Sequence, residues 1–186
     1  MRIISGSLKG KLINFIKNSN TRPLKDSVRE NIFNILKHSK LIRVDIEKSN
    51  ILDLYSGIGS FGIESISRGA KKVTFIEKDF HASNMLEKNL KKLAVNKKYN
   101  IYNDKIENFL ESSVKEKFDI FFFDPPFADF NFYQNLELIK KIKIYKKNHI
   151  VIIHREKKSK DEFKKLLNII FVKEYGRSKI FFGEFI

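Results

Sequence analysis

The fold is decided by the stretch Ile51-Leu52-Asp53-Leu54-Tyr55-Ser56-Gly57-Ile58-Gly59-Ser60-Phe61-Gly62. It opens with a short, mainly apolar run that has the length of a buried strand. Its three glycines have the G-x-G-x-x-G spacing, which lets the chain turn tightly beside a ligand and lets the next helix pack on the strand. That helix is expected to run to about Arg68, where Gly69 ends it. A strand, glycine turn and helix in this order are typical of dinucleotide enzymes and of methyltransferases.

Strands and helices alternate along the rest of the chain. Apolar runs predict further strands at 73–77, 101–103, 118–123 and 149–154, and helical periodicity predicts helices near 80–95, 105–112, 132–143 and 159–168. Two closing strands, 170–174 and 178–182, have a short connection and should form an antiparallel hairpin. The predicted fold class is α/β: a Rossmann-like, mostly parallel, seven-stranded sheet with helices on both faces and a C-terminal antiparallel hairpin.

A small extension precedes this pattern. Residues 1–20 are expected to form a β-hairpin, because two apolar runs flank the turn-like residues 6–10. A helix over about 27–38 should follow the loop 21–23, with Asp26 or Ser27 as its N-cap. We therefore divide the chain into an N-terminal extension, residues 1–40, on the substrate side, and a main domain, residues 41–186.

The composition limits the classes of function. The 186 residues include no cysteine, which excludes disulfides, thiolate metal sites and cysteine nucleophiles. No apolar run has the length of a membrane span or a signal peptide, so we expect a cytoplasmic protein, and nothing suggests an obligate dimer. The net charge of +15 favours a polyanionic partner. Only seven of the 37 basic residues are arginine, so the codon bias of an AT-rich genome is an alternative source of the charge.

Acidic residues stand where a nucleotide-like cofactor would need them. Asp53 lies inside the first strand, where it can face the ammonium of a bound amino acid or cap the next helix. Glu77 ends the second strand and can accept hydrogen bonds from both ribose hydroxyls. Asp104 follows the third strand and can bind an adenine amine or cap a helix. The expected cofactor-binding residues are Asp53, Tyr55, Ser56, Gly57, Gly59, Glu77, Lys78 and Asp104.

The tetrapeptide Asp124-Pro125-Pro126-Phe127 follows the most apolar strand. Prolines stiffen a loop and lack backbone donors, so their carbonyls and the Asp124 carboxylate are acceptors that can face a ligand. Two acceptors would orient a nucleobase amine, Asp124 would take up its proton, and the Phe127 ring would stack on the base. No metal is expected. The four histidines, His38, His81, His149 and His154, have no ligand spacing and are predicted to be structural or surface residues.

These residues resemble the RsmD-type 16S ribosomal-RNA guanine-N2 methyltransferases, which have the class I methyltransferase fold. The resemblance covers nearly the whole chain and rests on the blocks Arg2–Gly6, Lys9–Leu12, Thr21–Pro23, Val28–Glu30, Phe33–Leu36, Leu52–Glu64, Ser67–Ala70 and Asp124–Phe127. It implies S-adenosylmethionine as cofactor and a guanine amine of the small ribosomal subunit or its assembly intermediate as target. Ile58, Tyr55 and Lys25 depart from the family pattern but keep the backbone roles.

The resemblance also gives the N-terminal segment a role. It implies that Arg22 and Arg29 lie near the substrate mouth and hold RNA, with Arg2 and Lys9 extending a basic rim. Salt bridges that fasten the extension to the core are an equal alternative for the two arginines. Two other functions stay open: a DNA adenine-N6 methyltransferase, and a non-catalytic RNA-binding assembly factor that kept the fold.

Overall fold

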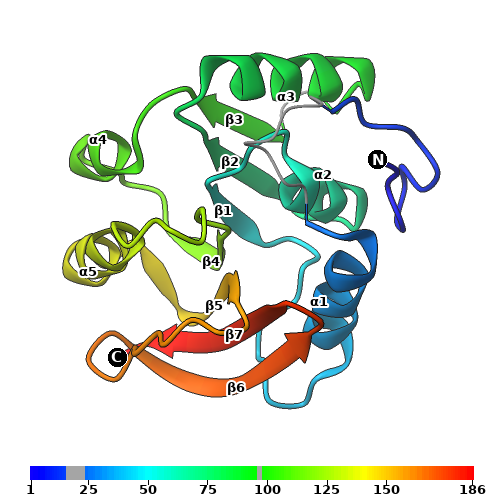
Figure 1. Cartoon of the computed structure of the whole chain (residues 1–186). Helices are drawn as coiled ribbons and strands as arrows, with labels where there is room; N and C mark the ends of the chain where they lie inside the picture. Colours follow the sequence, from blue (N-terminus) through cyan, green and yellow to red (C-terminus); the bar gives the residue numbers. More distant parts are fainter. Residues whose placement is uncertain (16–23, 96–97) are drawn as a thin grey trace.

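A seven-stranded sheet forms the centre of the protein, and its order is β3-β2-β1-β4-β5-β7-β6 (Figure 1). The computed structural model describes residues 1–15, 24–95 and 98–186. The strands are β1 Asn50–Leu54, β2 Lys72–Ile76, β3 Tyr99–Tyr102, β4 Phe118–Phe123, β5 Tyr145–Glu156, β6 Leu167–Tyr175 and β7 Ser178–Phe185. β1 to β5 pair in parallel, and β7 runs antiparallel to both of its neighbours. The predicted fold class is confirmed, with β7 as the one antiparallel strand of the described sheet.

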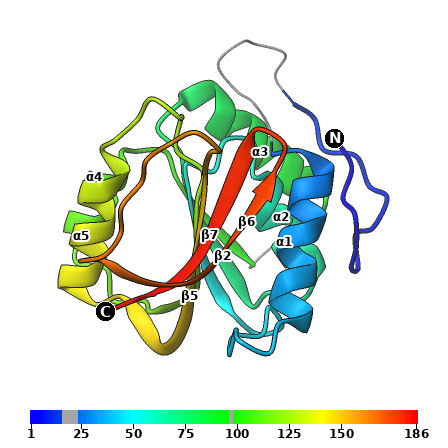
Figure 2. The ribbon, with the colours of Figure 1, turned by 60° about the horizontal axis from the view of Figure 1, so that its bottom comes forward.

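Helices cover both faces of the sheet (Figure 2). The helices α1 Asp26–His38, α2 Ser60–Ser67 and α3 Phe80–Lys92 pack on one face, and α4 Ile106–Glu111 and α5 Phe132–Ile142 pack on the other. Every residue of strand β4 except Asp119 is apolar, and its packing shows why. Phe122 stacks on Phe61 of α2 with ring centroids 4.0 Å apart, while Phe121 and Phe123 belong to the core on the opposite face. A central parallel strand is buried on both sides, so it has no polar alternation.

The N-terminal segment is held by buried polar contacts rather than by a regular hairpin. Within residues 1–15, one antiparallel bridge joins Arg2 to Leu12, and backbone hydrogen bonds between Ile3 and Lys11 and between Met1 and Ile13 flank it. The described part of the expected hairpin is therefore a short antiparallel contact, and residues 16–20 of that prediction lie outside the described residues. The Glu64 carboxylate of α2 accepts the backbone N–H groups of Ile4 at 2.8 Å and Ser5 at 3.0 Å. The segment therefore lies against α2, and its apolar residues share the core beneath α1 to α3.

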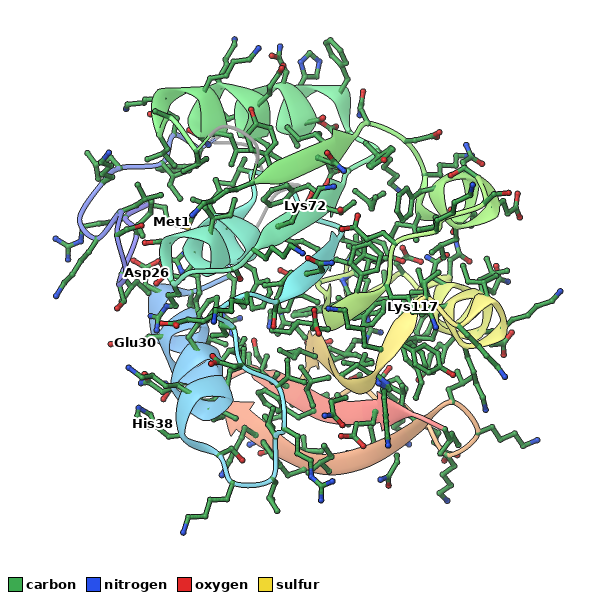
Figure 3. The ribbon with its side chains drawn as sticks, turned by 180° about the vertical axis from the view of Figure 1, so that it is seen from behind. Met1, Asp26, Glu30, His38, Lys72 and Lys117 are labelled. Carbon is green, nitrogen blue, oxygen red and sulfur yellow. The ribbon has the colours of Figure 1, made fainter. Side chains whose placement is uncertain are left out.

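Arg29 joins this segment to α1. Its guanidinium donates to the Arg2 carbonyl at 2.7 Å and to Asp26 at 3.0 Å, and it lies 3.9 Å from Glu64. Figure 3 shows Met1 and Asp26 close together at this point. Burial lowers the pKa of Arg29, and the carboxylates of Asp26 and Glu64 oppose that shift. Asp26 is the first residue of α1 and does not cap it; the N-cap is Lys25, without a side-chain hydrogen bond, so the predicted cap is wrong.

The helix predicted at 159–168 is absent, and this prediction is wrong. Residues 157–158 and 164–166 form turns, residues 159–163 have no regular secondary structure, and β6 begins at Leu167. The reason is tertiary: Asp161 turns inward to accept Arg155 Nε at 3.2 Å, and Leu167 pairs with Phe185 of β7. A helical pattern of apolar residues is overridden where a buried ion pair and a strand partner compete for the same segment. Within the described ranges, no helix is long and apolar enough to cross a membrane.

Candidate active site

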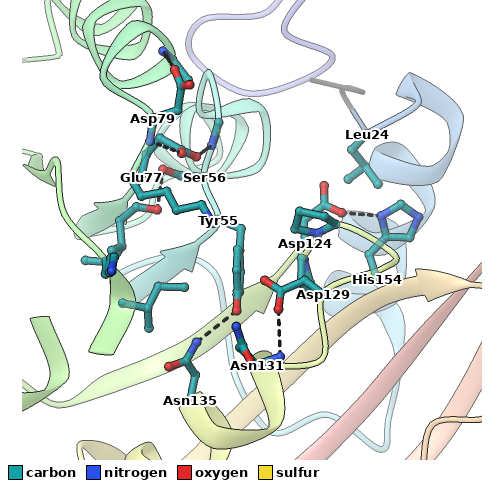
Figure 4. A pocket seen from close by; sticks show the side chains of 18 of the residues that line it. Leu24, Tyr55, Ser56, Glu77, Asp79, Asp124, Asp129, Asn131, Asn135 and His154 are labelled. Atoms are coloured by element: carbon teal, nitrogen blue, oxygen red, sulfur yellow. Dashed lines mark hydrogen bonds and ion pairs between the residues drawn. The ribbon is translucent and has the colours of Figure 1, made fainter. Parts of the chain in front are cut away.

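A cavity of about 990 Å³ opens at the carboxyl ends of β1, β2 and β4 (Figure 4). This is the edge of a parallel sheet where ligands bind, because loops and helix N-termini converge there. Its walls come from the glycine turn after β1, the ends of β2 and β3, the loop after β4, the start of α1 and His154 of β5. The cavity therefore brings together segments that are up to about 160 residues apart in the chain, from Phe15 to Ser178.

The glycine turn takes the shape that its spacing predicted. Gly57 and Gly59 have φ values of +55° and +82°, and Gly59 is the N-cap of α2. Asp53 is 1% exposed, and its carboxylate accepts the Gly62 N–H at 3.0 Å, beneath the turn. This contact matches the capping alternative for Asp53, because it holds the turn against the end of β1. Asp53 is absent from the described walls of the cavity.

Glu77 is held at the end of β2 by the backbone. Its carboxylate accepts the Gly57 N–H at 2.7 Å and the Asp79 N–H at 2.8 Å, one on each oxygen. Ser56 ties the same region together, since its N–H and its hydroxyl both donate to the Ile76 carbonyl. Each carboxylate oxygen of Glu77 keeps a second lone pair for a ligand hydroxyl, and the side chain lines the cavity.

Tyr55, Lys78 and Asp104 also line the cavity. Tyr55 has a φ of +61°, which is unusual for a residue with a side chain, and its hydroxyl accepts the Asn135 amide at 3.0 Å. Burial raises the pKa of Tyr55, so the hydroxyl stays neutral. Asp104 accepts its neighbour's backbone N–H and the Asn108 amide, both at 2.7 Å. The sequence had indicated each of these residues except Asn135.

The loop after β4 presents fewer acceptors than its sequence suggested. The Pro126 carbonyl accepts the Asp129 N–H at 2.8 Å and Arg155 Nη1 at 3.3 Å, so its expected role as a free acceptor is wrong. Among the described residues, no donor reaches the Pro125 carbonyl. The Asp124 side chain is 23% exposed and lines the cavity. Asp124 and the Pro125 carbonyl remain as the acceptors of this loop.

His154 is the residue of this site that sequence reasoning missed. It was predicted to be structural or on the surface, yet it lines the cavity and its Nδ1 lies 2.7 Å from Asp124 Oδ1 (Figure 4). The Phe127 ring stands edge-on to the imidazole, with centroids 5.6 Å apart. The two residues are thirty positions apart, so only the pairing of β4 with β5 brings them together.

Known proteins with similar sequences identify the family. Residues 1–184 match the family model described as "Conserved hypothetical protein 95". Ribosomal RNA small subunit methyltransferase D of Buchnera aphidicola subsp. Acyrthosiphon pisum is 37% identical over 161 residues, covering 84% of this chain and 78% of that protein. The protein of the same name from Haemophilus influenzae is 35% identical over 159 residues, covering 84% and 79%. This chain belongs to the RsmD family of methyltransferases.

The fold agrees with this membership. The solved structure of the Escherichia coli protein yhhF superimposes with a TM-score of 0.81 at 26% sequence identity, covering 100% of this chain and 97% of that one. The methyl donor of this RsmD-family chain is S-adenosylmethionine, which supplies a methyl group already activated on a positively charged sulfonium.

The electrostatics of the cavity suit that cation. The protein carries a net charge of +15, yet the cavity walls hold seven acidic side chains and four lysine or arginine side chains. Burial raises the pKa of Asp53 well above its usual range; the Gly62 N–H opposes this shift, and the negative charges of Asp124 and Glu77 add to it. A cationic ligand placed among these carboxylates relieves their mutual repulsion, so the residues present fit an S-adenosylmethionine site.

The basic residues expected at the substrate mouth lie elsewhere. Arg29 is fully buried and makes the salt bridges of the alternative interpretation. Arg2 and Lys9 are exposed on the segment that lies against the C-terminal half of α2, away from the cavity walls. Arg22 lies outside the described residues. The lysine and arginine side chains that do line the mouth are Lys25, Lys78, Lys105 and Arg177.

Proposed function

We propose that this protein transfers a methyl group from S-adenosylmethionine to the exocyclic N2 amine of a guanine in small-subunit (16S) ribosomal RNA. The observation that carries the proposal is the placement of the glycine turn, Glu77 and the loop Asp124–Phe127 around one cavity (Figure 4). The RNA target is supported by the relatives, which are named small-subunit ribosomal RNA methyltransferases. The net charge of +15 suits a phosphate-rich partner.

Two groups of residues divide the work of cofactor binding. The Glu77 carboxylate, held by two backbone amides, accepts the ribose hydroxyls of the donor. Gly57 and Ser56 bring the backbone close to the amino-acid portion, and Asp53 supports the turn from below through the Gly62 N–H. Tyr55, Lys78 and Asp104 complete the walls around the donor, with Asp104 at the adenine end. Gly59 is absent from the described walls and acts instead through the turn, as the N-cap of α2.

The loop after β4 acts on the target amine. The lone pair of a guanine N2 amine is delocalised into the ring, which makes it a poor nucleophile. The Asp124 carboxylate and the Pro125 carbonyl accept its two N–H bonds and direct its lone pair at the methyl group, and Phe127 stacks on the base while Pro126 closes the turn. As the N–C bond forms and the S–C bond breaks, Asp124 takes the released proton.

The proposed partner of this protein is ribosomal RNA. The target base lies in ribosomal RNA within a small subunit or its assembly intermediate, and the protein acts as a cytoplasmic monomer. Lys25, Lys105 and Arg177, whose side chains line the cavity, meet RNA phosphate at its mouth. Arg22, three residues before Lys25 in the sequence, contributes to the same RNA binding, whereas Arg2, Lys9 and Arg29 fasten the N-terminal segment.

The test is transfer of labelled methyl to small ribosomal subunits, naked ribosomal RNA and duplex DNA, all from cells that lack this protein. We expect label on a guanine N2 amine of the subunit or its RNA. We also expect Asp124→Ala to lower kcat by 100-fold or more, in the range of a lost general base, while the dissociation constant for S-adenosylmethionine stays within threefold.

The matched control is Asp119→Ala, at the other end of the same strand. Asp119 accepts the Asn50 N–H and Lys146 Nζ, both at 2.7 Å, and is absent from the described cavity walls. This variant should lose stability and keep its activity per folded molecule. Asp124→Ala activity within about tenfold of the parent, or about 1.4 kcal/mol of barrier, would remove Asp124 from the chemistry. Label on DNA adenine would establish the alternative methyltransferase function. Absence of both methyl transfer and cofactor binding would favour an assembly factor, whereas cofactor binding without transfer would mean that the substrate is wrong.

A further inference from the structure

Two histidines of β5 are buried, and they are held in different ways. His149 is 5% exposed, its Nδ1 donates to the Lys146 carbonyl at 2.8 Å, and its Nε2 accepts the Phe185 N–H at 2.9 Å. Both ring nitrogens thus serve the fold. His154 is 9% exposed, and its one hydrogen bond within the described residues goes to the Asp124 carboxylate in the cavity. Its Nε2 is buried with no partner among those residues.

The proton in the His154–Asp124 contact can be assigned. A distance of 2.7 Å between a ring nitrogen and a carboxylate oxygen requires a hydrogen between them. An ionised carboxylate only accepts, so Nδ1–H of His154 donates to Oδ1 of Asp124. A carboxylate is planar, and fixing Oδ1 therefore also fixes the direction of Oδ2. The Phe127 ring packs against the imidazole at an interplanar angle of 77°, on the cavity side of this contact.

The next residue of the strand braces the same loop from the other side. Arg155 is fully buried and donates to the carbonyls of Phe127 at 3.1 Å and Pro126 at 3.3 Å. Successive residues of a strand point to opposite faces, so His154 reaches the loop's side chain while Arg155 reaches its backbone. Two neighbouring residues of β5 thus hold both parts of the loop that carries the proposed chemistry.

We infer that His154 is a positioning residue for methyl transfer. It holds Asp124 Oδ1, so that Oδ2 is left to accept the N–H of the target amine and to receive its proton. The imidazole keeps its own Nδ1 proton throughout, so its role is to fix geometry. This inference rests on the proposed function, because it acts through Asp124.

The experiment compares kcat, KM and the dissociation constant for S-adenosylmethionine across His154→Leu, His154→Asn and the control His149→Asn. His154→Leu should lower kcat by 10- to 100-fold while cofactor affinity stays within twofold. Asparagine carries an N–H at the position of Nδ1, so His154→Asn should recover activity to within about fivefold of the parent. His149→Asn should lower the unfolding midpoint and leave kcat per folded molecule unchanged.

A double variant makes the test specific. If His154 acts through Asp124, adding His154→Leu to Asp124→Ala should change kcat by less than twofold, because the pair works as one unit. The inference is overturned if His154→Leu keeps kcat within threefold, if His154→Asn is as poor as His154→Leu, or if the two losses multiply in the double variant. Absence of methyl transfer by the parent protein would overturn the proposed function. An active Asp124→Ala would remove Asp124 from the proposed chemistry and this inference with it, whereas an inactive Asp124→Ala beside an active His154→Leu would overturn this inference alone.

Discussion

Glu77 illustrates how single residues of this site serve the fold and the ligand together. Its two carboxylate oxygens each accept a backbone N–H, from Gly57 and from Asp79, so its position is set before any ligand arrives. In the proposed cofactor site, such preorganisation would lower the cost of binding the ribose, because little side-chain entropy would be lost. Asp53 fixes the opposite side of the same turn, because its carboxylate accepts the Gly62 N–H.

Replacing Glu77 with alanine should weaken S-adenosylmethionine binding by about 1–3 kcal/mol, the scale of a lost hydrogen bond to a charged group. Isothermal titration of the purified protein measures this directly. Glu87→Ala is the control, since Glu87 pairs with Lys91 on the exposed side of α3 and is absent from the described cavity walls. An unchanged dissociation constant for Glu77→Ala would remove Glu77 from the cofactor site.

At the scale of elements, strand β5 connects the loop after β4 to the C-terminal third of the chain. Arg155 is the connection: it is fully buried, pairs with Asp161 at 3.2 Å and lies over the Phe132 ring at 4.5 Å. Its guanidinium also donates to two carbonyls of the loop after β4. One side chain therefore holds the loop, the start of α5 and the turn before β6.

Arg155→Met should lower the free energy of unfolding by about 3–5 kcal/mol, because it leaves the Asp161 carboxylate buried without its partner. Denaturant titration measures the change. Lys157→Met is the matched control two residues along: its ion pair with Glu174 is half exposed, so its loss should cost less than about 1 kcal/mol. Equal losses in the two variants would show that the buried pair contributes no more than the exposed one.

At the scale of the whole molecule, opposite charges are separated. The chain has a net charge of +15, while the cavity is acidic. This arrangement suits a protein that holds a cationic donor inside and a polyanion outside, because each ligand meets the charge opposite to its own. The stability of the whole molecule should also depend on pH. His149 of β5 is buried and accepts the Phe185 N–H of β7, so its protonation would disturb the contact between these two strands.

Burial lowers the pKa of His149 below its usual value of 6.5, with the Lys146 carbonyl opposing the shift. In the window below pH 6.5 the unfolded chain binds a proton that the folded protein excludes. Stability is therefore fully present above pH 6.5 and falls as the pH drops towards the folded-state pKa, by at most about 1.4 kcal/mol per pH unit from this group. Urea titrations between pH 5 and pH 8 measure the slope. His149→Asn should flatten it, and an unchanged slope would assign the effect to other groups.

Much of the architecture is determined by local sequence. β4 was predicted with its observed bounds, the glycine turn has the expected positive φ angles, and Gly69, with φ +98°, follows the end of α2. These features depend on neighbours within a few residues: the length of an apolar run, the spacing of glycines and the stiffness of prolines. The same local information placed Glu77, Asp104 and Asp124 at the carboxyl ends of strands, and so on the walls of one cavity.

Tertiary structure alone decided the partners of these groups. His154 meets Asp124 only because β4 and β5 pair in parallel. Residues 159–166 are drawn from a helical pattern into irregular structure and a turn because Asp161 meets a buried arginine. Arg29 is buried, and it holds the N-terminal segment, because it pairs with the carboxylates of Asp26 and Glu64. Local sequence determines which conformations a segment prefers, whereas the charges and hydrogen bonds that complete a buried group come from residues distant in the chain, which only the packed sheet brings into reach.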